Sequence, residues 1–267
     1  MNEIIITGLC RHCGAGLTST VVMVLGHKNI VPNECDCQKA EREAREKEKI
    51  RQGIDIIRKL RRKSSGIYRR QEGQTLGSFI PRAGQQEAHE RAKLFISELC
   101  ADPHTKGMLF VGAVGSGKTH LAASIANRVI DLSEISDRTA IKAAELYDIA
   151  YEAEFNRRVQ FISMIGLLGA IKKTFDTNET AQDIVDRYSK AELLILDDVG
   201  TETPTEWSNE RLFEIIDYRY NEELPTVITT NLLPDKLREN VGDRSYDRIR
   251  EMCHMVKITA NSQRVTA

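Results

Sequence analysis

The order of apolar and polar positions divides this 267-residue chain into three zones. From about residue 74 onward, short apolar runs alternate with stretches in which apolar residues recur at helical spacing, such as 119–130. The candidate strands cover residues 108–111, 159–162, 193–196, 226–229 and 255–258. Strands that alternate with helices predict an α/β fold with a mostly parallel sheet covered on both faces. In such sheets, ligands bind at the carboxyl ends of the strands.

The middle zone, residues 39–63, is highly charged and has one apolar stripe. Its apolar residues recur three or four positions apart, at Ile50, Ile54, Ile57 and Leu60. This spacing predicts a helix with one packed face, and the sequence Ser-Ser-Gly at 64–66 ends it. We therefore expect a small module at 1–38, a charged helical linker at 39–66 and an α/β domain at 67–267.

Charge is unevenly distributed, although the formal net charge is only -1. Residues 39–70 hold 13 Lys and Arg against 5 Asp and Glu, a net of +8, which leaves -9 for the rest. The dense basic patch comprises Arg58, Lys59, Arg61, Arg62, Lys63, Arg69 and Arg70. Such a patch attracts the phosphates of single-stranded DNA, and Tyr68 would stack a base. The alternative is a solvated helix that links two modules, with Tyr68 in the core of the large domain.

The start of the chain bears on its compartment. The first ten residues lack the basic start and long apolar region of a signal peptide. The longest apolar run, 21–25, is too short to cross a bilayer. We therefore expect a cytoplasmic protein without membrane contact. Disulfides are rare in the cytoplasm. Two isolated cysteines, Cys100 and Cys253, are then expected to be buried apolar residues.

The other four cysteines lie within 28 residues near the N-terminus. They form a C-x-x-C pair and a tighter C-x-C pair, namely Cys10, Cys13, Cys35 and Cys37. A hairpin that brought the pairs together would make a tetrahedral thiolate site for structural zinc. His12 or His27 would be able to replace one ligand. The alternative is four free thiols.

The stretch GAVGSGKT, residues 112–119, fits the pattern G-x-x-x-x-G-K-T between a predicted strand and a predicted helix. Its glycines let backbone N–H groups point at phosphate oxygens, and the following helix aims its positive end there. Lys118 would reach the β- and γ-phosphates, and Thr119 would offer its hydroxyl to Mg²⁺. The candidate nucleotide ligands are Gly112, Gly115, Ser116, Gly117, Lys118, Thr119 and His120.

Two further polar strand ends complete a candidate catalytic centre. In LLILDDVGTE, Asp197 would hold Mg²⁺ and Asp198 would polarise the attacking water, with Glu202 a weaker candidate. In VITTNL, Asn231 follows a strand and would orient this water or contact the γ-phosphate. The alternatives are a solvated strand exit for the aspartates and a turn cap for the asparagine.

These motifs together resemble the AAA+ ATPases, and within them the group of DnaC/DnaI helicase loaders and IstB proteins. The resemblance covers roughly residues 68–264. It includes GIYRRQEGQTLGSFI, GAVGSGKTHLAASIAN, LLILDDVGTETPTEW, IIDYRYNEELPTVITTNL and GDRSYDRIRE. It implies ATP and Mg²⁺ as cofactors and slow, assembly-dependent ATP hydrolysis. It also implies a primosome protein that places a replicative DNA helicase on single-stranded DNA during replication initiation.

The resemblance leaves one alternative function, an IstB-like transposition helper ATPase that binds duplex DNA and a transposase. The DnaI-type loaders place a zinc-binding module before the ATPase, and the N-terminal part of such loaders contacts the helicase. This layout favours the loader, because no such module is expected in IstB proteins.

The same resemblance gives a role to two arginines in GDRSYDRIRE. In AAA+ proteins an arginine of one subunit reaches the nucleotide of the next, which implies self-association through the ATP site. By position, Arg248 resembles this arginine finger and Arg244 is the alternative, since a guanidinium stays charged and forks onto phosphate oxygens. The competing interpretation pairs both arginines with Asp243, Asp247 or Glu251 on the helix surface.

The sequence departs from the family pattern in three places. Asp198 stands where many AAA+ enzymes have glutamate, which predicts slow hydrolysis. The segment between the predicted helix after the phosphate loop and the second strand, residues 131–158, is longer than is usual in the family, and we expect it to contain an inserted helix. The chain ends soon after the last strand, so we expect no separate helical lid, and Arg264 is either a sensor arginine or part of a frayed terminus.

Overall fold

The computed structural model describes residues 3–24, 27–145, 159–174, 179–260 and 262. The chain forms two compact units. The first comprises Met1–Ile57 and Ile135–Tyr147, and the second comprises Arg58–Glu134 and Asp148–Ala267. Each unit has its own β-sheet. Within the described ranges, no helix combines the length and apolar character needed to span a bilayer.

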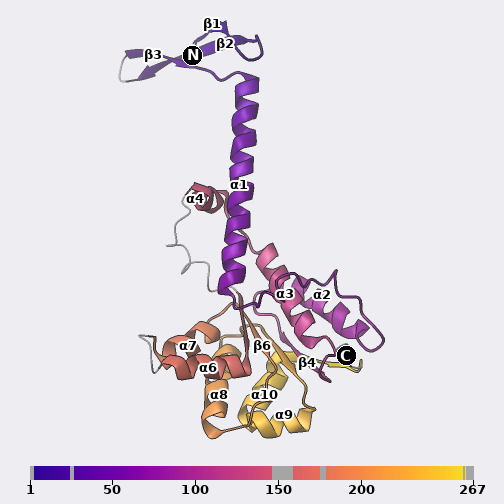
Figure 1. Cartoon of the computed structure of the whole chain (residues 1–267). Helices are drawn as coiled ribbons and strands as arrows, with labels where there is room; N and C mark the ends of the chain where they lie inside the picture. The colour runs from indigo at the N-terminus through magenta and orange to yellow at the C-terminus, as the bar shows by residue number, and fades with distance from the viewer. Residues whose placement is uncertain (1–2, 25–26, 146–158, 175–178, 261, 263–267) are drawn as a thin grey trace. The chain divides into compact units, whose positions relative to one another are not determined.

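The first unit contains a three-stranded antiparallel sheet in the order β1-β2-β3 (Figure 1). Its strands are β1 (Glu3–Leu9), β2 (Gly16–Val24) and β3 (His27–Pro32). Their many β-branched residues favour extended backbone. Gly14 has a φ of 71° in the turn between β1 and β2, a backbone conformation that glycine adopts easily. Strands β2 and β3, which lie between the two cysteine pairs, are antiparallel neighbours, so the hairpin expected from the cysteine spacing is present.

Helix α1 (Asp36–Ser64) begins in the first unit and ends in the second. Its bounds are close to the predicted 39–63. Residues 38–49 are exposed on every side, so this stretch relies on ion pairs between neighbouring turns, such as Arg45 with Glu41 at 2.5 Å.

A second helix of the first unit, α4 (Asp137–Glu145), lies in the predicted insert. It contacts α1 through an ion pair between Lys49 and Glu145 at 2.9 Å. Gly53 of α1 lies directly against the backbone of Ala140, where any larger residue would clash. The prediction of an inserted helix is confirmed for the described part, and residues 146–158 lie outside it.

The second unit contains a five-stranded sheet in the order β5-β6-β7-β4-β8, and all its strand pairs are parallel. The strands are β4 (Gly107–Gly112), β5 (Val159–Ser163), β6 (Leu193–Asp197), β7 (Thr226–Thr230) and β8 (Cys253–Ile258). Each apolar run singled out in the sequence is a strand, and the predicted α/β fold with a parallel sheet is confirmed. The carboxyl ends of β6, β7 and β4 are neighbours at one end of the sheet.

Helices cover both faces of this sheet. Helices α2 (Gln86–Ala101) and α3 (Lys118–Leu132) pack on one face. The other face is covered by α6 (Met164–Lys173), α7 (Ala181–Ser189), α8 (Glu206–Asn221), α9 (Pro234–Val241) and α10 (Asp243–Met252) (Figure 1). Alternate residues of a strand join the two cores, as Phe110 and Leu109 of β4 do.

A buried arginine fastens α8 to the starts of two strands. Arg219 has 0% exposure. It donates to the hydroxyl of Thr226 at 2.8 Å and to the carbonyl oxygens of Ala191 at 2.7 Å and Pro225 at 2.6 Å. Burial lowers the pKa of Arg219 to about 9, which still leaves the side chain charged at neutral pH. These bonds hold the amino ends of β6 and β7, whose other ends form the site.

The two isolated cysteines differ. Cys253 is buried, as predicted, at the start of β8. Cys100 is exposed, so the prediction of a buried residue is wrong there. The buried residues of α2 include Ala92, Phe95 and Ile96, and Cys100 lies one turn beyond Ile96, where the buried face of the helix stops.

Candidate nucleotide site and cysteine cluster

The loop between β4 and α3 has the backbone geometry of a phosphate cradle. Gly115 and Gly117 have φ values of 79° and 97°, which favour glycine and let successive N–H groups turn toward one concave side. A Cβ atom on Gly117 would lie 2.9 Å from the ring of Phe79, so glycine is needed there for space as well. Helix α3 begins at the next residue, Lys118. The positive end of a 15-residue helix therefore faces this loop.

Lys118 lies across the same loop. Its Nζ donates to the carbonyl oxygens of Gly112 at 2.8 Å and Ala113 at 2.9 Å. Only 5% of the residue is exposed. The ammonium group is thus held at the mouth of the phosphate cradle, where a bound anion would meet a charge that water screens poorly.

Thr119 connects the loop with the end of β6. Its hydroxyl donates to the carboxylate of Asp197, 2.9 Å from Oδ1 and 3.1 Å from Oδ2. The hydroxyl of Thr229, on β7, donates to the same Oδ1 at 2.7 Å. Burial raises the pKa of Asp197, against the opposing effect of these hydrogen bonds. Hydroxyl and carboxylate oxygens are the hard ligands that Mg²⁺ prefers, so Thr119 and Asp197 fit this ion.

The other predicted catalytic side chains lie at the same end of the sheet. Asp198 is exposed and has a φ of 55°, and its N–H donates to the hydroxyl of Thr229 at 2.9 Å. Asn231 directly follows β7 and is half-buried. Glu202 is also half-buried, and burial raises its pKa. The hydrogen bonds therefore join Thr119, Asp197 and the backbone of Asp198, whereas Asn231 and Glu202 are placed nearby by chain connectivity.

Three supporting residues were missed in the sequence. Thr229 bonds both aspartates but was treated only as a strand residue. Gln85 is fully buried and its Nε2 donates to the carbonyl oxygen of Ser116 at 2.8 Å. Phe79 packs edge-on against His120, with ring centroids 5.1 Å apart. Burial lowers the pKa of His120. The motif TTNL pointed at Thr229, but no sequence signal links Phe79 or Gln85 to the loop.

The four N-terminal cysteines converge in the first unit. Cys10 and Cys13 lie at the turn after β1, and Cys35 and Cys37 flank the start of α1. All four Sγ atoms lie within 4.8 Å of one another. The Sγ atom of Cys35 lies 3.2 Å from that of Cys10, 3.9 Å from that of Cys13 and 2.9 Å from that of Cys37, and the Sγ atoms of Cys10 and Cys37 are 3.6 Å apart. Tetrahedral zinc with Zn–S bonds of about 2.3 Å has sulfurs about 3.8 Å apart, so small outward shifts would fit the cluster to zinc.

One thiol of this cluster ionises easily. Hydrogen bonds from the backbone of Cys13 and His12 lower the pKa of Cys10 to about 6. The thiol of Cys37 has a raised pKa because Cys35 hydrogen-bonds to it. A thiolate beside protonated thiols is the expected starting point for a metal, which binds deprotonated cysteine and releases protons.

Comparisons with known proteins give a consistent family. Residues 148–267 match the model of the IstB-like ATP binding proteins. The replicative helicase loader DnaC of Escherichia coli strain K12 is 25% identical over 168 residues, which are 62% of this chain and 58% of DnaC. The replicative helicase loader DnaI of Bacillus subtilis strain 168 is 26% identical over 136 residues, 51% of this chain and 36% of DnaI. The chain therefore spans less than two thirds of these relatives.

A solved structure agrees with these matches. The crystal structure of the DnaC helicase loader superposes with a TM-score of 0.55 and 25% identity, over 72% of this chain and 99% of that one. The chain is thus similar to the AAA+ ATPases of the DnaC, DnaI and IstB group. The resemblance drawn from the sequence is thereby confirmed.

The two candidate finger arginines, Arg244 and Arg248, lie on α10. Arg248 is half-buried against α8, because its Nη2 pairs with Asp217 at 2.6 Å and its guanidinium lies 4.8 Å from the ring of Phe213. Arg244 is exposed, with its guanidinium 5.9 Å from the same ring.

The pairing proposed for these arginines as an alternative is not found. In the described part of the chain, no ion pair joins either arginine to Asp243, Asp247 or Glu251. Asp243 pairs with Arg238 instead, at 2.5 Å. Arg264, the candidate sensor arginine, lies outside the described residues.

Proposed function

We propose that this protein binds ATP with Mg²⁺ and hydrolyses it slowly, and that this cycle drives the loading of a replicative DNA helicase during replication initiation. The contact between Thr119 and Asp197 carries the ATPase part of the proposal. It joins the phosphate loop to an acidic strand end, as Mg²⁺-dependent P-loop enzymes require. The similarity to DnaC and DnaI supports helicase loading as the purpose.

Each residue of the site has a role in this proposal. Loop N–H groups and Lys118 hold the phosphates, and Thr119 with Asp197 holds Mg²⁺, which would neutralise charge on the phosphate oxygens. Asp198 polarises the attacking water and Asn231 orients it. The aspartate side chain is shorter than the glutamate of many AAA+ enzymes, so it reaches the water less well and hydrolysis is slow.

The direct test combines one variant and one partner experiment. Lys118→Ala should abolish ATP binding in calorimetry, and unchanged affinity would reject the phosphate-loop assignment. Size-exclusion chromatography with the replicative helicase of the same genome should show co-elution that differs between ATP and ADP. Failure to co-elute with either nucleotide would reject the loader.

The first unit is the proposed grip on the helicase, with structural zinc held by its four cysteines. Three large apolar side chains of its sheet are exposed, with Leu9 at 71%, Ile30 at 59% and Val31 at 48%. Exposed apolar groups of this kind favour a protein partner. Leu9→Asp should weaken co-elution with the helicase and leave ATP affinity unchanged, whereas full co-elution of this variant would place the grip elsewhere.

Self-association through the ATP site is proposed to use Arg248 or Arg244. Arg248 would have to leave Asp217 to reach a neighbouring nucleotide, while Arg244 is free of ion pairs among the described residues. Arg244→Ala and Arg248→Ala should each keep ATP binding, and the finger variant should lose turnover. Mixing the finger variant with Lys118→Ala should restore some activity, and no restoration for either arginine would reject a shared site.

Single-stranded DNA is the proposed nucleic-acid ligand. Four basic side chains of the patch are exposed, namely Lys59, Lys63, Arg69 and Arg70. Tyr68 is 56% exposed, so its predicted alternative place in the core is wrong. Replacing both Arg69 and Arg70 by alanine should reduce the slope of log affinity against log salt by about 1.4. An unchanged slope would place the DNA elsewhere.

The second candidate is an IstB-like helper that binds duplex DNA and a transposase, and the family model over 148–267 favours it. The cysteine cluster favours the loader instead. Tight binding to long duplex DNA, together with no affinity for the helicase, would decide for the helper.

A further inference from the structure

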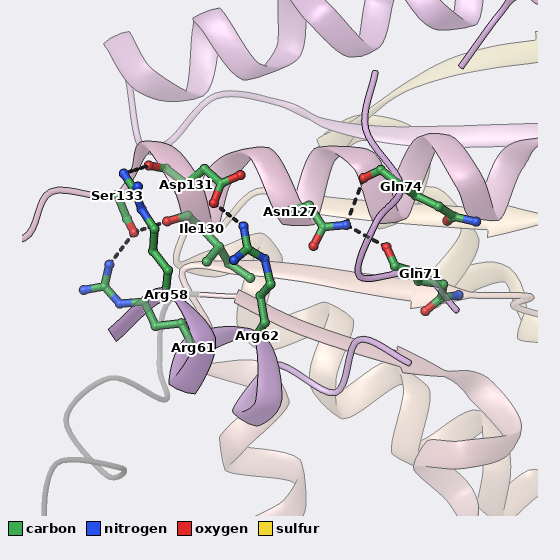
Figure 2. Close-up of polar contacts among 9 residues, drawn as sticks. All are labelled: Arg58, Arg61, Arg62, Gln71, Gln74, Asn127, Ile130, Asp131 and Ser133. Carbon is green, nitrogen blue, oxygen red and sulfur yellow. Dashed lines mark hydrogen bonds and ion pairs between the residues drawn. The ribbon is translucent and has the colours of Figure 1, made fainter. Parts of the chain in front are cut away.

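In the second unit, residues 58–85 run along one face of α3, from the C-terminus of this helix to its N-terminus. The last turns of α1 contact the C-terminus of α3 at Asp131 and Ser133. Farther along the chain, the carbonyl oxygens of Gln71 and Gln74 accept hydrogen bonds from Asn127 at 2.8 and 2.9 Å. Figure 2 shows both sets of contacts.

The same segment then reaches the phosphate loop. Phe79 packs on His120 in the first turn of α3, and Gln85 bonds the carbonyl oxygen of Ser116. Asn127 and His120 lie seven residues apart, close to two full turns, so they share a face of the helix. Residues 58–85 therefore form a strap that runs along the helix whose N-terminus cradles phosphate.

Three arginines anchor the far end of this strap. Arg58 Nη2 donates to the backbone carbonyl oxygen of Asp131 at 2.7 Å. Arg61 donates to the hydroxyl of Ser133, and Arg62 pairs with the carboxylate of Asp131. All three side chains point at the last turn of α3 (Figure 2). We call Arg58, Arg61 and Arg62 the arginine clamp.

The clamp supplies what the helix terminus lacks. The last turn of α3 contains no basic residue of its own, although the carbonyl end of a helix favours nearby cations. The hydroxyl of Ser133 is also tied to the carbonyl oxygen of Ile130 at 2.7 Å. The Nε atoms of Arg58 and Arg62 are buried without a hydrogen-bond partner among the described residues. The Nη atoms of these arginines make the bonds to the helix end, and hydrogen bonds that involve a charged group are stronger than neutral ones.

We propose that the arginine clamp consists of positioning residues for the nucleotide site. Helix α3 is 15 residues long, so its ends are about 22 Å apart, and it transmits displacement of one end to the other as a rigid rod. Release of the clamp would shift Lys118 and Thr119 relative to Asp197 and weaken nucleotide binding. This inference rests on the proposed ATP binding, and it assigns to Arg58, Arg61 and Arg62 a role other than DNA contact.

Linkage makes the coupling reciprocal, so nucleotide must in turn strengthen the clamp. The first measurement is the affinity of the full chain for a non-hydrolysable ATP analogue with Mg²⁺, by calorimetry. Arg62→Gln and Asp131→Asn should each weaken binding by about fivefold, and the double variant should be no weaker than either single one. Arg62→Lys, which keeps the charge, should recover part of the loss.

A matched control exists on the same helix. Arg45 pairs with Glu41 on the solvated part of α1, and Arg45→Gln should leave the affinity unchanged. The second measurement is hydrogen exchange of the amides at 129–133. The analogue should slow this exchange in the wild type and fail to do so in Arg62→Gln, an effect that a merely structural ion pair would not produce.

The outcomes separate the two proposals. If the wild type binds the ATP analogue and the folded variants Arg62→Gln and Asp131→Asn bind it with the same affinity, the arginine clamp is not a positioning device. This holds even if both variants melt at a lower temperature. If Arg62→Gln fails to fold, Arg62→Lys and Ser133→Ala decide in the same assays, and unchanged affinity in both overturns the inference. A wild type that binds no analogue would overturn the proposed ATP site and the inference with it.

Discussion

The hydroxyl of Thr229 lies 2.7 Å from Oδ1 of Asp197 and donates its proton to that carboxylate. The same hydroxyl oxygen accepts the N–H of Asp198 at 2.9 Å. One side chain of β7 therefore fixes both acidic residues at the end of β6. This arrangement matters because Asp198 has an unusual backbone, with a φ of 55° that costs energy for a residue other than glycine.

Replacing this threonine by valine should damage the site more than the fold. Thr229→Val keeps the shape but leaves the N–H of Asp198 unbonded and removes one bond from Asp197, which should cost about 1–3 kcal/mol of unfolding free energy. Mg²⁺-dependent ATP binding should weaken as Asp197 loses its fixed orientation. Denaturant unfolding and calorimetry measure the two effects.

The next residue on the strand provides the control. Thr230 is equally buried, and its hydroxyl donates to the carbonyl oxygen of Val199 at 2.8 Å without touching either aspartate. Thr230→Val should lose similar stability but retain Mg²⁺-dependent binding. Equal loss of binding in both variants would show that Thr229 acts only through general stability.

Acidification should affect stability and nucleotide binding in opposite directions. Burial raises the pKa of Asp197, so the folded protein takes up this proton more readily than the unfolded chain. The group then stabilises the fold as pH falls, and this contribution is lost as pH rises through its folded pKa. Mg²⁺ requires the carboxylate, so binding of its ATP complex weakens as pH falls through the same pKa.

Melting temperature without nucleotide and affinity with Mg²⁺ and ATP should both be followed against pH. Asp197→Asn cannot titrate and should lose this share of the pH dependence of stability. If the melting profile of Asp197→Asn has the same shape as that of the wild type, another carboxyl, such as Glu202, causes the effect.

The fold was accessible from the sequence because its central strands are buried on both faces. Such strands are short and continuous in apolar residues, as 108–111 and 193–196 are. Placement of Cys100 failed because the apolar stripe of a helix shows where its buried face lies but not where that face stops. Exposure at the last turn depends on what packs against it.

The site was accessible only where a motif states the chemistry. Lys118, Thr119 and Asp197 follow from two local patterns, and the structure joins Thr119 to Asp197 and Lys118 to the phosphate loop. The arginine clamp did not follow, because residues 58–62 and 131–133 are far apart in sequence. A basic cluster has the same sequence pattern whether it binds the phosphates of a nucleic acid or the C-terminal end of another helix. Only the tertiary structure distinguishes these two cases.

Arg219 should be essential for stability. Arg219→Met leaves the carbonyl oxygens of Ala191 and Pro225 without their donor, and each buried unpaired acceptor costs about 1–3 kcal/mol. We expect a loss of about 3 kcal/mol or more in denaturant unfolding. Arg211 on the same helix pairs with Glu214 at 2.8 Å near the surface, so Arg211→Met should cost about 0–1 kcal/mol. Similar losses would mean that burial of Arg219 adds nothing.

Zinc removal should unfold the first unit selectively. Few apolar side chains of the first unit are buried among the described residues, so a structural metal would supply much of its folding free energy, on the order of 10 kcal/mol. We expect one zinc per chain by atomic absorption and fast hydrogen exchange throughout β1–β3 after chelation, with exchange in β4–β8 unchanged. Cys35→Ser should reproduce this loss, because Cys35 is buried and close to the other three sulfurs.

A cysteine outside the cluster provides the control. Cys100 is exposed, and Cys100→Ser should retain the metal. Protection of β1–β3 that survives chelation would show that the four thiols fold this sheet without zinc.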